Sequence, residues 1–476
     1  MAEISSLDPS EALRARRWDA LIIGSGIAAH VAAARIGAAG QRVLIVEEEA
    51  QAQMPPAAKE PFFLSGLRDR GVLDACLSKL GVPLIDRRRL ANERLAYQIA
   101  ADPFRLDIGQ PIVTAEELVT WGLAKPDDAQ SLIRHLFESS EIERGLLLEA
   151  AFVRIGRRSA GGRHAATPIG NHKRGLPGDV AAAKGDLQRV LEAQIRSLSN
   201  LGSTPPSPEA QTRLLGLGLG GGIGFSGGPP WLMELLRKRV TSLFGDFRSL
   251  PGDFEIVSVS GQPGIRVTQT GEIWLGRALI LAAPRSALRE SVDSNPAHPA
   301  PGFLKSTTTR SYRGVFLYRV PIEVLPEAMS ARVILPEMQS EQSQVGTVSV
   351  TAFPSQTHSG HVDLVARGIV TPADPAELQE SLKQVHQSIA ERLEALMPFC
   401  GDRLESIEMR MPRWDSDDGW LEDPRPGTGW PAEIDLRVST RSPIYCLDRA
   451  ASAGLGLEGD LLLGWRGGDA IAAELA

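Results

Sequence analysis

The sequence predicts an α/β fold in which the chain opens on a strand, a glycine turn, a helix and a second strand. An apolar run of strand length, Asp19–Ile23, ends at Gly24. A helical segment follows from Ile27 to about Ala39, and Arg42–Val46 has the pattern of the next strand. Two consecutive strands joined through a helix imply a parallel sheet.

Composition limits the classes of function. A chain of 476 residues is too long for one ordinary core, so we expect two domains. The net charge of −7 gives no general attraction to nucleic acid. The three cysteines show no metal-binding or redox spacing, so we expect no metal and a reducing, cytoplasmic location. No signal peptide or membrane span is recognisable, and any membrane contact is expected to be peripheral.

A second regular block follows a long region of mixed helices and loops. Its pattern predicts a helix over Pro230–Leu243 and then strands that end at Ala282-Ala283-Pro284. The strands are expected at Phe254–Val259, Ile265–Thr268, Glu272–Leu275 and Ala278–Leu281. Further strands are predicted at Gly314–Val320, Val345–Ala352 and Val362–Ile369, before a long helix over Pro375–Leu396.

The first turn has the spacing of a dinucleotide-binding loop, with small residues at Gly24, Gly26 and Ala29. The first glycine allows the tight turn, and the second lets the backbone approach a pyrophosphate at the helix N-terminus. Glu47, with Glu48 beside it, ends the second strand 21 residues after Gly26. That spacing suits an acid that binds a ribose hydroxyl and repels the 2′-phosphate of NADP.

Several stretches together resemble the superfamily of phytoene desaturases and flavin-containing amine oxidases. They are the opening strand–helix–strand unit, the Gly227-Gly228 pair before a helix, and the strands that end at Ala282-Ala283-Pro284 and lead into Ser286-Ala287-Leu288. The resemblance spans roughly the whole chain. It implies a Rossmann-like FAD-binding domain, with a parallel sheet and a three-stranded β-meander, plus an inserted α+β substrate domain.

The resemblance also implies how the chain is divided. Residues 18–60, 220–292 and 440–476 form the discontinuous FAD-binding domain, 61–219 and 293–439 the substrate or lid domain, and 1–17 a flexible arm. The backbone at Ile256 is expected to contact adenine. The full cofactor-binding set is Gly24, Ser25, Gly26, Ile27, Ala28, Ala29, Glu47, Glu48, Ile256, Ala282, Ala283, Pro284, Gly464, Gly468, Asp469 and Ala470.

Two segments depart from the pattern of active superfamily members. Glu47 is followed by EEAQAQMPPAAKEPFFLSG, which lacks the usual Gly-Gly-Arg-like loop. Near the C-terminus, Gly467 and Gly468 are expected to begin the final helix, but the segment that normally precedes this turn is missing. We therefore expect the ADP half of FAD to be held better than the flavin ring.

These observations leave several hypotheses open. The first is an FAD-dependent oxidoreductase that passes hydride from an apolar, isoprenoid- or carotenoid-like substrate to flavin N5. No lysine follows Pro284, which argues against amine oxidation, and no acid–base pair identifies catalytic residues. The alternative is a non-catalytic relative, similar to GDP-dissociation inhibitors, that binds FAD, a lipid or a partner. An NAD-dependent dehydrogenase fits the second block less well, and the oligomeric state is undetermined.

Overall fold

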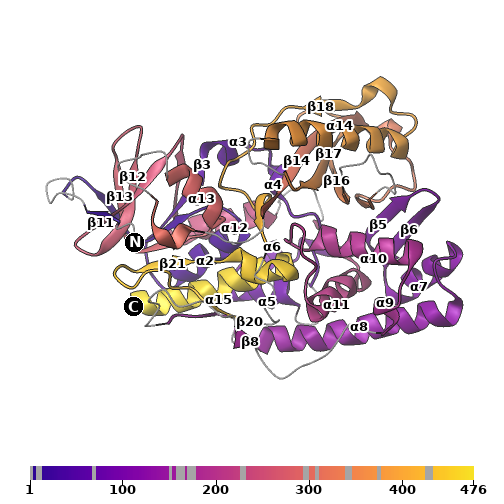
Figure 1. Cartoon of the computed structure of the whole chain (residues 1–476), viewed down its shortest axis with the longest axis horizontal. Helices are drawn as coiled ribbons and strands as arrows, with labels where there is room; N and C mark the ends of the chain where they lie inside the picture. Colours follow the sequence, from indigo (N-terminus) through magenta and orange to yellow (C-terminus); the bar gives the residue numbers. More distant parts are fainter. Residues whose placement is uncertain are drawn as a thin grey trace.

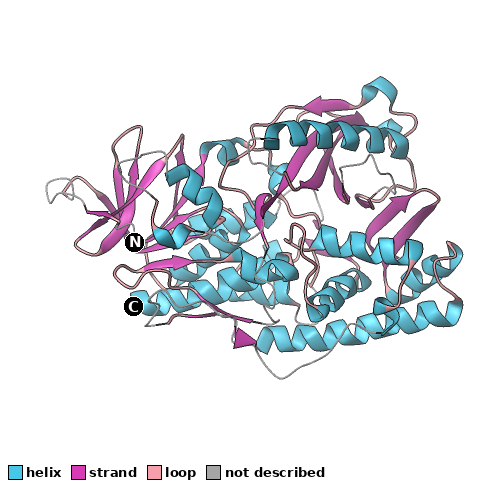
Figure 2. Cartoon of the chain, viewed as in Figure 1, coloured by secondary structure: helices cyan, strands magenta, loops and turns pink. Residues whose placement is uncertain are grey.

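Two mixed β-sheets organise the chain (Figure 1). The computed structural model describes residues 4–6, 13–66, 71–149, 153–156, 167–168, 178–225, 232–292, 300–305, 310–337, 346–372, 377–423 and 432–476. Helices pack against both sheets and form much of one end of the molecule (Figure 2). Among the described helices, none is long and apolar enough to cross a bilayer.

The first sheet contains the predicted parallel strands and the predicted meander. Its order is β1 (Ser5–Ser6), β11 (Phe254–Val259), β12 (Gln262–Val267), β13 (Ile273–Leu281), β2 (Arg16–Ile23), β3 (Val43–Glu48) and β10 (Asp246–Leu250), and β21 (Ile444–Cys446) also pairs with β13. Strands β10, β3, β2 and β13 are parallel, whereas β11, β12 and β13 form an antiparallel meander. The predicted Rossmann-like α/β fold is confirmed.

Two sequence-based boundaries in this sheet are wrong. The strands expected at Glu272–Leu275 and Ala278–Leu281 are one strand, β13, because its pairing with β2 runs through Gly276 and resumes at Ala278. The arm expected over residues 1–17 contributes to the sheet: Ser5 and Ser6 pair with β11, and Arg16 and Arg17 already belong to β2.

Two helices on this sheet lie side by side, α2 (Ile27–Ala38) and α15 (Leu457–Leu475) (Figure 1). Five small side chains of α2 are buried, so its backbone approaches α15 closely: Ala28, Ala29, Ala32, Ala33 and Ala34. A Cβ on Gly464 would lie 2.5 Å from the carbonyl oxygen of Ala28, and one on Gly468 would lie 2.9 Å from Cα of Ala32. Helices α5 (Val72–Lys79) and α12 (Leu232–Ser242) join the same hydrophobic core.

The second sheet joins two distant parts of the chain. Its order is β18 (Glu405–Ile407), β14 (Arg310–Pro321), β17 (His361–Val370), β16 (Val348–Pro354), β15 (Arg332–Leu335), β5 (Leu95–Ala101) and β6 (Phe104–Gly109), with β19 (Gly419–Glu422) also on β14. Helix α14 (Leu378–Leu396) covers this sheet (Figure 1). Buried valines and leucines on β14, β16 and β17 pack beneath it.

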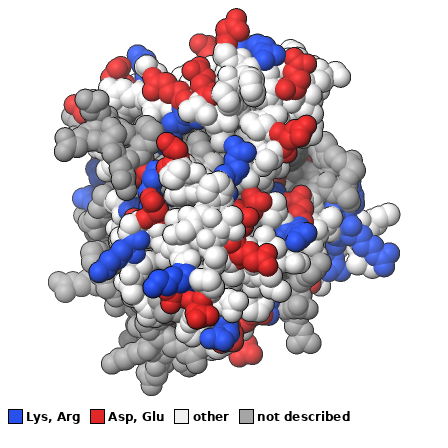
Figure 3. Space-filling view, turned by 90° about the vertical axis from the view of Figure 1, so that its right-hand side faces the viewer, with Lys and Arg blue, Asp and Glu red and all other residues white. Residues whose placement is uncertain are grey.

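A helical group lies at the β5–β6 end of the second sheet (Figure 2). It contains α7 (Pro111–Thr120), α8 (Pro126–Glu149), α10 (Gly185–Leu198) and α11 (Pro208–Leu217). On the face shown in Figure 3, the acidic and basic side chains of described residues are interspersed. The remaining short elements are α3 (Glu49–Gln53), α4 (Pro56–Lys59), α6 (Leu84–Arg87), α9 (Gly178–Ala181), α13 (Arg285–Val292), β4 (Leu90–Glu93), β7 (Val153–Arg154), β8 (Thr167–Pro168), β9 (Gly222–Phe225) and β20 (Ala432–Asp435).

Candidate functional site

The glycine loop between β2 and α2 has the predicted tight geometry. Gly24 adopts a φ of 115°, a conformation that side chains rarely accept. A Cβ on Gly24 would lie 3.0 Å from the carbonyl carbon of Ala282. The amide of Ala282 in turn donates to the carbonyl of Ile23 at 2.8 Å. The glycine loop therefore lies directly against Ala282 and Ala283.

Two aspartates from a distant segment accept hydrogen bonds from this loop. The amide of Ser25 donates to Oδ1 of Asp415 at 2.5 Å, and the Ser25 hydroxyl donates to its Oδ2 at 2.7 Å. The amide of Ile27 donates to Oδ2 of Asp417 at 2.9 Å. A Cβ on Gly26 would lie only 2.1 Å from Oδ1 of Asp417. The segment 412–418 therefore fills the space directly above the loop.

The position of these carboxylates matches the electrostatics of a helix start. The N-terminus of a helix offers unpaired amide donors and a partial positive charge, which favour an anion. Burial raises the pKa of Asp415 to about 7, although hydrogen bonds from Ser25 and Glu48 act in the opposite direction. Burial raises the pKa of Asp417 to about 6, against the lowering effect of Arg449. The chain thus supplies its own acids where a pyrophosphate would bind.

The two acids at the end of β3 are also paired within the chain. The guanidinium of Arg237 donates to both oxygens of Glu47, at 3.0 and 3.1 Å. Oε2 of Glu48 accepts the amides of Arg413 at 2.8 Å and of Trp414 at 2.9 Å. Both glutamates are buried. The acid expected to bind a ribose is therefore held by an arginine of α12, and its neighbour anchors the segment 412–418.

The region after these acids replaces the missing glycine-rich loop with helices α3 and α4. Glu60 follows them, and its carboxylate accepts the amides of Leu232 and Met233, each at 2.9 Å. It thereby satisfies the first amides of α12. Burial raises the pKa of Glu60 to about 7, with partial opposition from those hydrogen bonds and from Arg367.

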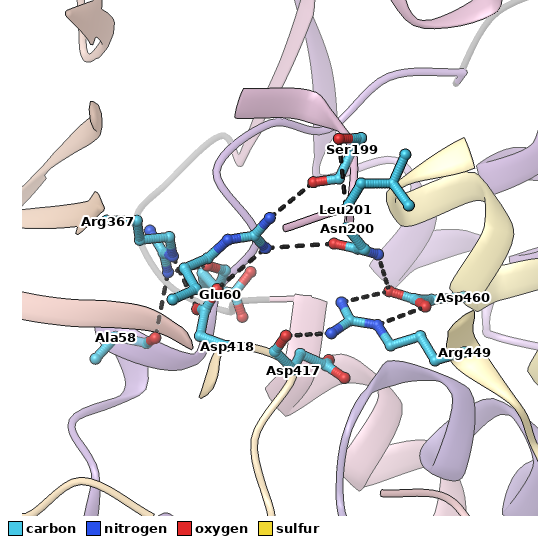
Figure 4. Close-up of polar contacts among 11 residues, drawn as sticks. Ala58, Glu60, Ser199, Asn200, Leu201, Arg367, Asp417, Asp418, Arg449 and Asp460 are labelled. Atoms are coloured by element: carbon cyan, nitrogen blue, oxygen red, sulfur yellow. Dashed lines mark hydrogen bonds and ion pairs between the residues drawn. The ribbon is translucent and has the colours of Figure 1, made fainter. Parts of the chain in front are cut away.

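A buried ionic network lies between the two sheets (Figure 4). Asp418 accepts from Nε of Arg367 at 2.9 Å and from Nη1 of Arg313 at 3.4 Å. Burial alone would raise the pKa of Asp418, but Arg367 and Arg313 outweigh it and lower that pKa. Arg449 binds both oxygens of Asp460 at 2.9 Å and also donates to the backbone carbonyl of Asp417.

Two cavities adjoin the occupied loop. One, of about 80 Å³, lies along the ionic network and the first turn of α15, and its lining includes Ile27, Asp417, Arg313 and Glu458. The other, of about 170 Å³, is lined by Ser25, His30, Glu47, Gln51, Pro56, Lys59, Glu60, Met233, Glu234 and Arg237. The glycine loop, with Asp415 and Asp417 bound to it, thus lies between the two cavities.

FAD does not fit the site in this conformation. The amides of Ser25 and Ile27, which would face the pyrophosphate, already donate to carboxylates. The space over Gly26 contains the side chain of Asp417. The first turn of α15 carries buried Glu458 and Asp460. Glu458 is paired with Arg213 and Asp460 with Arg449, so the charges at the start of α15 are already balanced within the chain.

The predicted residues at the C-terminus have a different role from the one expected. Helix α15 begins at Leu457, so the expectation that Gly467 and Gly468 begin the final helix is wrong. Gly464 and Gly468 lie within α15 and allow its contact with α2. Asp469 pairs with Arg35 of α2 at 2.5 Å, and Ala470 follows it in the same helix. These residues join two helices and do not form a turn around a ligand.

The other predicted residues divide into two groups. Ala28 and Ala29 are buried in α2 beside the loop, and Pro284 follows the Ala282-Ala283 pair at the end of β13. Ile256 is buried in β11, pairs with Ile265, and lines neither of the two cavities. The neighbouring Phe254 instead packs its ring against Trp414, with centroids 5.7 Å apart.

The sequence analysis missed the acids and arginines that make up the site. Asp415, Asp417 and Asp418 appear in the sequence only as an acidic stretch in an irregular, tryptophan-rich region. The arginines Arg313 and Arg367 come from β14 and β17 and carry no motif. The one signal in the sequence for a fixed site here is that these acids lie between Trp414 and Trp420. Buried tryptophans hold an irregular segment in place.

Comparisons with known proteins bear on the fold alone. No protein-family model and no curated protein matches the chain. Among solved structures, an oxidoreductase from Methanosarcina mazei is similar, with a TM-score of 0.53, 13% identity, and coverage of 94% of this chain and 99% of that one. The chain has the fold of that oxidoreductase.

Two further structures agree. A protein from Pyrococcus furiosus has a TM-score of 0.52 and 12% identity, with coverage of 97% of this chain and 98% of that one. A triple mutant of putrescine oxidase, redesigned in its cofactor binding, has a TM-score of 0.51 and 14% identity, covering 96% of this chain and 99% of the mutant. The shared architecture therefore extends over almost the whole chain, at 12–14% sequence identity.

Proposed function

We propose that this chain is a binding protein built on an oxidoreductase fold, with a dinucleotide site closed by its own segment 412–418. The observation that carries the proposal is the set of hydrogen bonds from Ser25 and Ile27 to Asp415 and Asp417. A pyrophosphate would compete for the same amides and would meet two carboxylates. The proposal shares its lack of catalysis with the alternative above but excludes FAD as the ligand, and its binding site is the cavity of about 80 Å³ along the ionic network.

Titration with FAD tests this proposal. We expect the purified protein to show no flavin absorbance and no quenching of added FAD fluorescence. The double variant Asp415→Ala, Asp417→Ala removes both carboxylates from the loop and should gain measurable affinity for FAD. Stoichiometric FAD in the purified wild-type protein would overturn the proposal.

A matched control distinguishes removal of the acids from the glycine loop from a general loss of stability. Asp423 also accepts several hydrogen bonds from a neighbouring loop, including the amides of Gly202 at 2.7 Å and Thr204 at 2.8 Å. Asp423→Ala removes a comparable buried acid outside the glycine loop. It should not confer FAD binding. If Asp423→Ala binds FAD as well as the double variant does, the closure by Asp415 and Asp417 is not the cause.

The second candidate is an FAD-dependent oxidoreductase that abstracts hydride from an apolar, isoprenoid-like substrate. The retained glycine loop, the acid at Glu47 and the shared fold favour it. This function requires segment 412–418 to leave the loop before the cofactor enters. Wild-type protein that binds FAD, and whose flavin is reduced by an isoprenoid substrate, would support this candidate over the first.

A further inference from the structure

The cavity of about 170 Å³ beside the start of α2 has two buried side chains with a free polar atom in its wall. His30 of α2 and Gln51 of α3 are 3% and 5% exposed. Nε2 of each has no hydrogen-bond partner among the described residues, and neither atom is fully enclosed by protein. Buried polar atoms are nearly always paired, so a ligand or water in this cavity must supply both partners.

The other ring nitrogen of His30 fixes its tautomer. Nδ1 lies 3.0 Å from the backbone carbonyl oxygen of Gly26, which can only accept, so Nδ1 carries the proton. Burial lowers the pKa of His30 to about 4, and the ring is therefore neutral at neutral pH. In this tautomer Nε2 is an acceptor. His30 thus requires a ligand that donates an O–H or N–H.

Two donors belong to the same wall. Oε1 of Gln51 is fully enclosed, so the side chain presents its NH2 group to the cavity. Nζ of Lys59 donates to the backbone carbonyl of Ala52 at 3.1 Å and has no ion-pair partner among the described residues, which leaves N–H groups for a ligand. A hydroxyl group has one donor and two acceptor positions, so it matches one acceptor and two donors.

The charges in this wall favour a neutral ligand. Arg237 is paired with Glu47 at 3.0 and 3.1 Å, so neither charge is left for a ligand. The remaining cation, Lys59, shares the wall with Glu60 and Glu234. An anion would meet these acids, and a carboxylate would also lack the proton that Nε2 of His30 requires.

The volume of the cavity suits a single ring. At about 170 Å³ it slightly exceeds the engineered cavity of about 150 Å³ that holds benzene. Pro56 and Met233 supply apolar contacts, and the thioether of a methionine packs well against an aromatic ring. The cavity along the ionic network, of about 80 Å³, is too small to compete for such a ligand.

We propose that the larger cavity binds a small phenol, a single aromatic ring whose hydroxyl donates to Nε2 of His30 and accepts from Gln51 or Lys59. The ring lies against Pro56 and Met233. This inference goes beyond the binding function proposed above, which concerns the smaller cavity. The two are tested separately, because the FAD titration reports on the glycine loop and phenol binding reports on His30 and Gln51.

Isothermal titration of the wild-type protein with phenol, toluene and benzoate tests the inference. Toluene replaces the hydroxyl of phenol by a methyl group of similar size, and benzoate replaces it by an anion. We expect saturable binding of phenol. Toluene should bind about tenfold more weakly or worse, because it leaves His30 and Gln51 unpaired, and benzoate should bind no better than toluene. The absence of saturable phenol binding would overturn the inference, as would toluene or benzoate binding as tightly as phenol.

Two variants locate the binding site. His30→Asn keeps an amide donor for the Gly26 carbonyl but removes the acceptor, and Gln51→Leu removes the amide at similar volume. Each should lower the ratio of phenol to toluene affinity several-fold, which a general loss of stability would not do. Gln194→Leu is the matched control, because Gln194 is also buried but lines neither cavity, and it should leave the ratio unchanged. An unchanged ratio in His30→Asn and Gln51→Leu would overturn the inference; if His30→Asn fails to fold, Gln51→Leu decides alone.

Discussion

The carboxylate of Asp415 accepts both the amide and the hydroxyl of Ser25, at 2.5 and 2.7 Å. Its Oδ2 also accepts the amide of Glu48 at 3.0 Å. One buried side chain thus connects the glycine loop, the end of β3 and the segment 412–418. This arrangement makes the closed loop a source of stability as well as a barrier to a dinucleotide.

Replacement of this carboxylate by an amide should weaken the fold. In Asp415→Asn, one acceptor oxygen remains, and the new NH2 group faces donors from Ser25 or Glu48. We expect the free energy of unfolding to fall by about 1–3 kcal/mol, because a buried donor loses its acceptor. Urea unfolding at neutral pH measures the effect. Asp402→Asn, at an exposed site, is the control, and an equal loss in both variants would contradict the prediction.

The stability of the fold should fall as the pH rises from about 4 to about 7. Burial raises the pKa values of Asp415 and Glu60 to about 7 and that of Asp417 to about 6, from 3.8 for the aspartates and 4.5 for the glutamate. In that range the folded chain binds more protons than the unfolded chain, so ionisation favours unfolding. Burial lowers the pKa of His30 from 6.5 to about 4 and also lowers the pKa of His386, and both histidines contribute in the opposite direction.

Urea unfolding at pH 5 and pH 8, at constant ionic strength, measures this dependence. We expect the lower free energy of unfolding at pH 8. Asp415→Asn removes one of the three acids and should reduce the difference between the two values. A higher free energy of unfolding at pH 8 than at pH 5 would show that these acids are ionised in the folded state throughout the range.

Loss of either partner of the ion pair between Arg213 and Glu458 should strongly lower the free energy of unfolding. Arg213 donates to the two oxygens of Glu458 at 2.8 and 2.5 Å, and both side chains are almost fully buried. Removal of one partner leaves an uncompensated buried charge, so Glu458→Leu or Arg213→Met should each cost about 3–5 kcal/mol. The double variant Arg213→Met, Glu458→Leu should recover much of that loss. Additive losses in the double-mutant cycle would contradict this expectation.

Gly464→Ala should destabilise the protein although alanine favours helices. A Cβ at this position would lie 2.5 Å from the carbonyl oxygen of Ala28, so α2 and α15 would have to separate. We expect a loss of about 1–3 kcal/mol from overpacking. Gly145 lies on an exposed part of α8, with no described atom within 4 Å of an added Cβ. Gly145→Ala should therefore stabilise the protein by about 0.5–1 kcal/mol.

The sequence predicts the framework well because its signals are local. The apolar run before Gly24, the helix that follows it and the strands around Ile265 depend on neighbouring residues, and their patterns survive without knowledge of contacts. The long helix predicted over Pro375–Leu396 is observed as α14, Leu378–Leu396. The sequence predicts less well where a strand ends. Strand β13 continues through Gly276 because it stays paired with β2 there.

The site could not be predicted in the same way, since it depends on contacts between distant segments. Nothing near Ser25 indicates that its partner is Asp415, and nothing near Asp418 indicates two arginines from the second sheet. The pair Gly467-Gly468 looked like a helix start because glycine normally disfavours a helix interior. In α15, close packing on α2 outweighs that preference.

The pairing of Ser25 with Asp415 also imposes an order on how the protein is made. The two residues are 390 positions apart, and α15, which packs on α2, begins only at Leu457. During synthesis, the amides at the start of α2 therefore face solvent until residues 412–418 have left the ribosome. Helix α2 is translated long before these partners, so chains that stop before residue 412 should show little protection of α2 amides from hydrogen exchange.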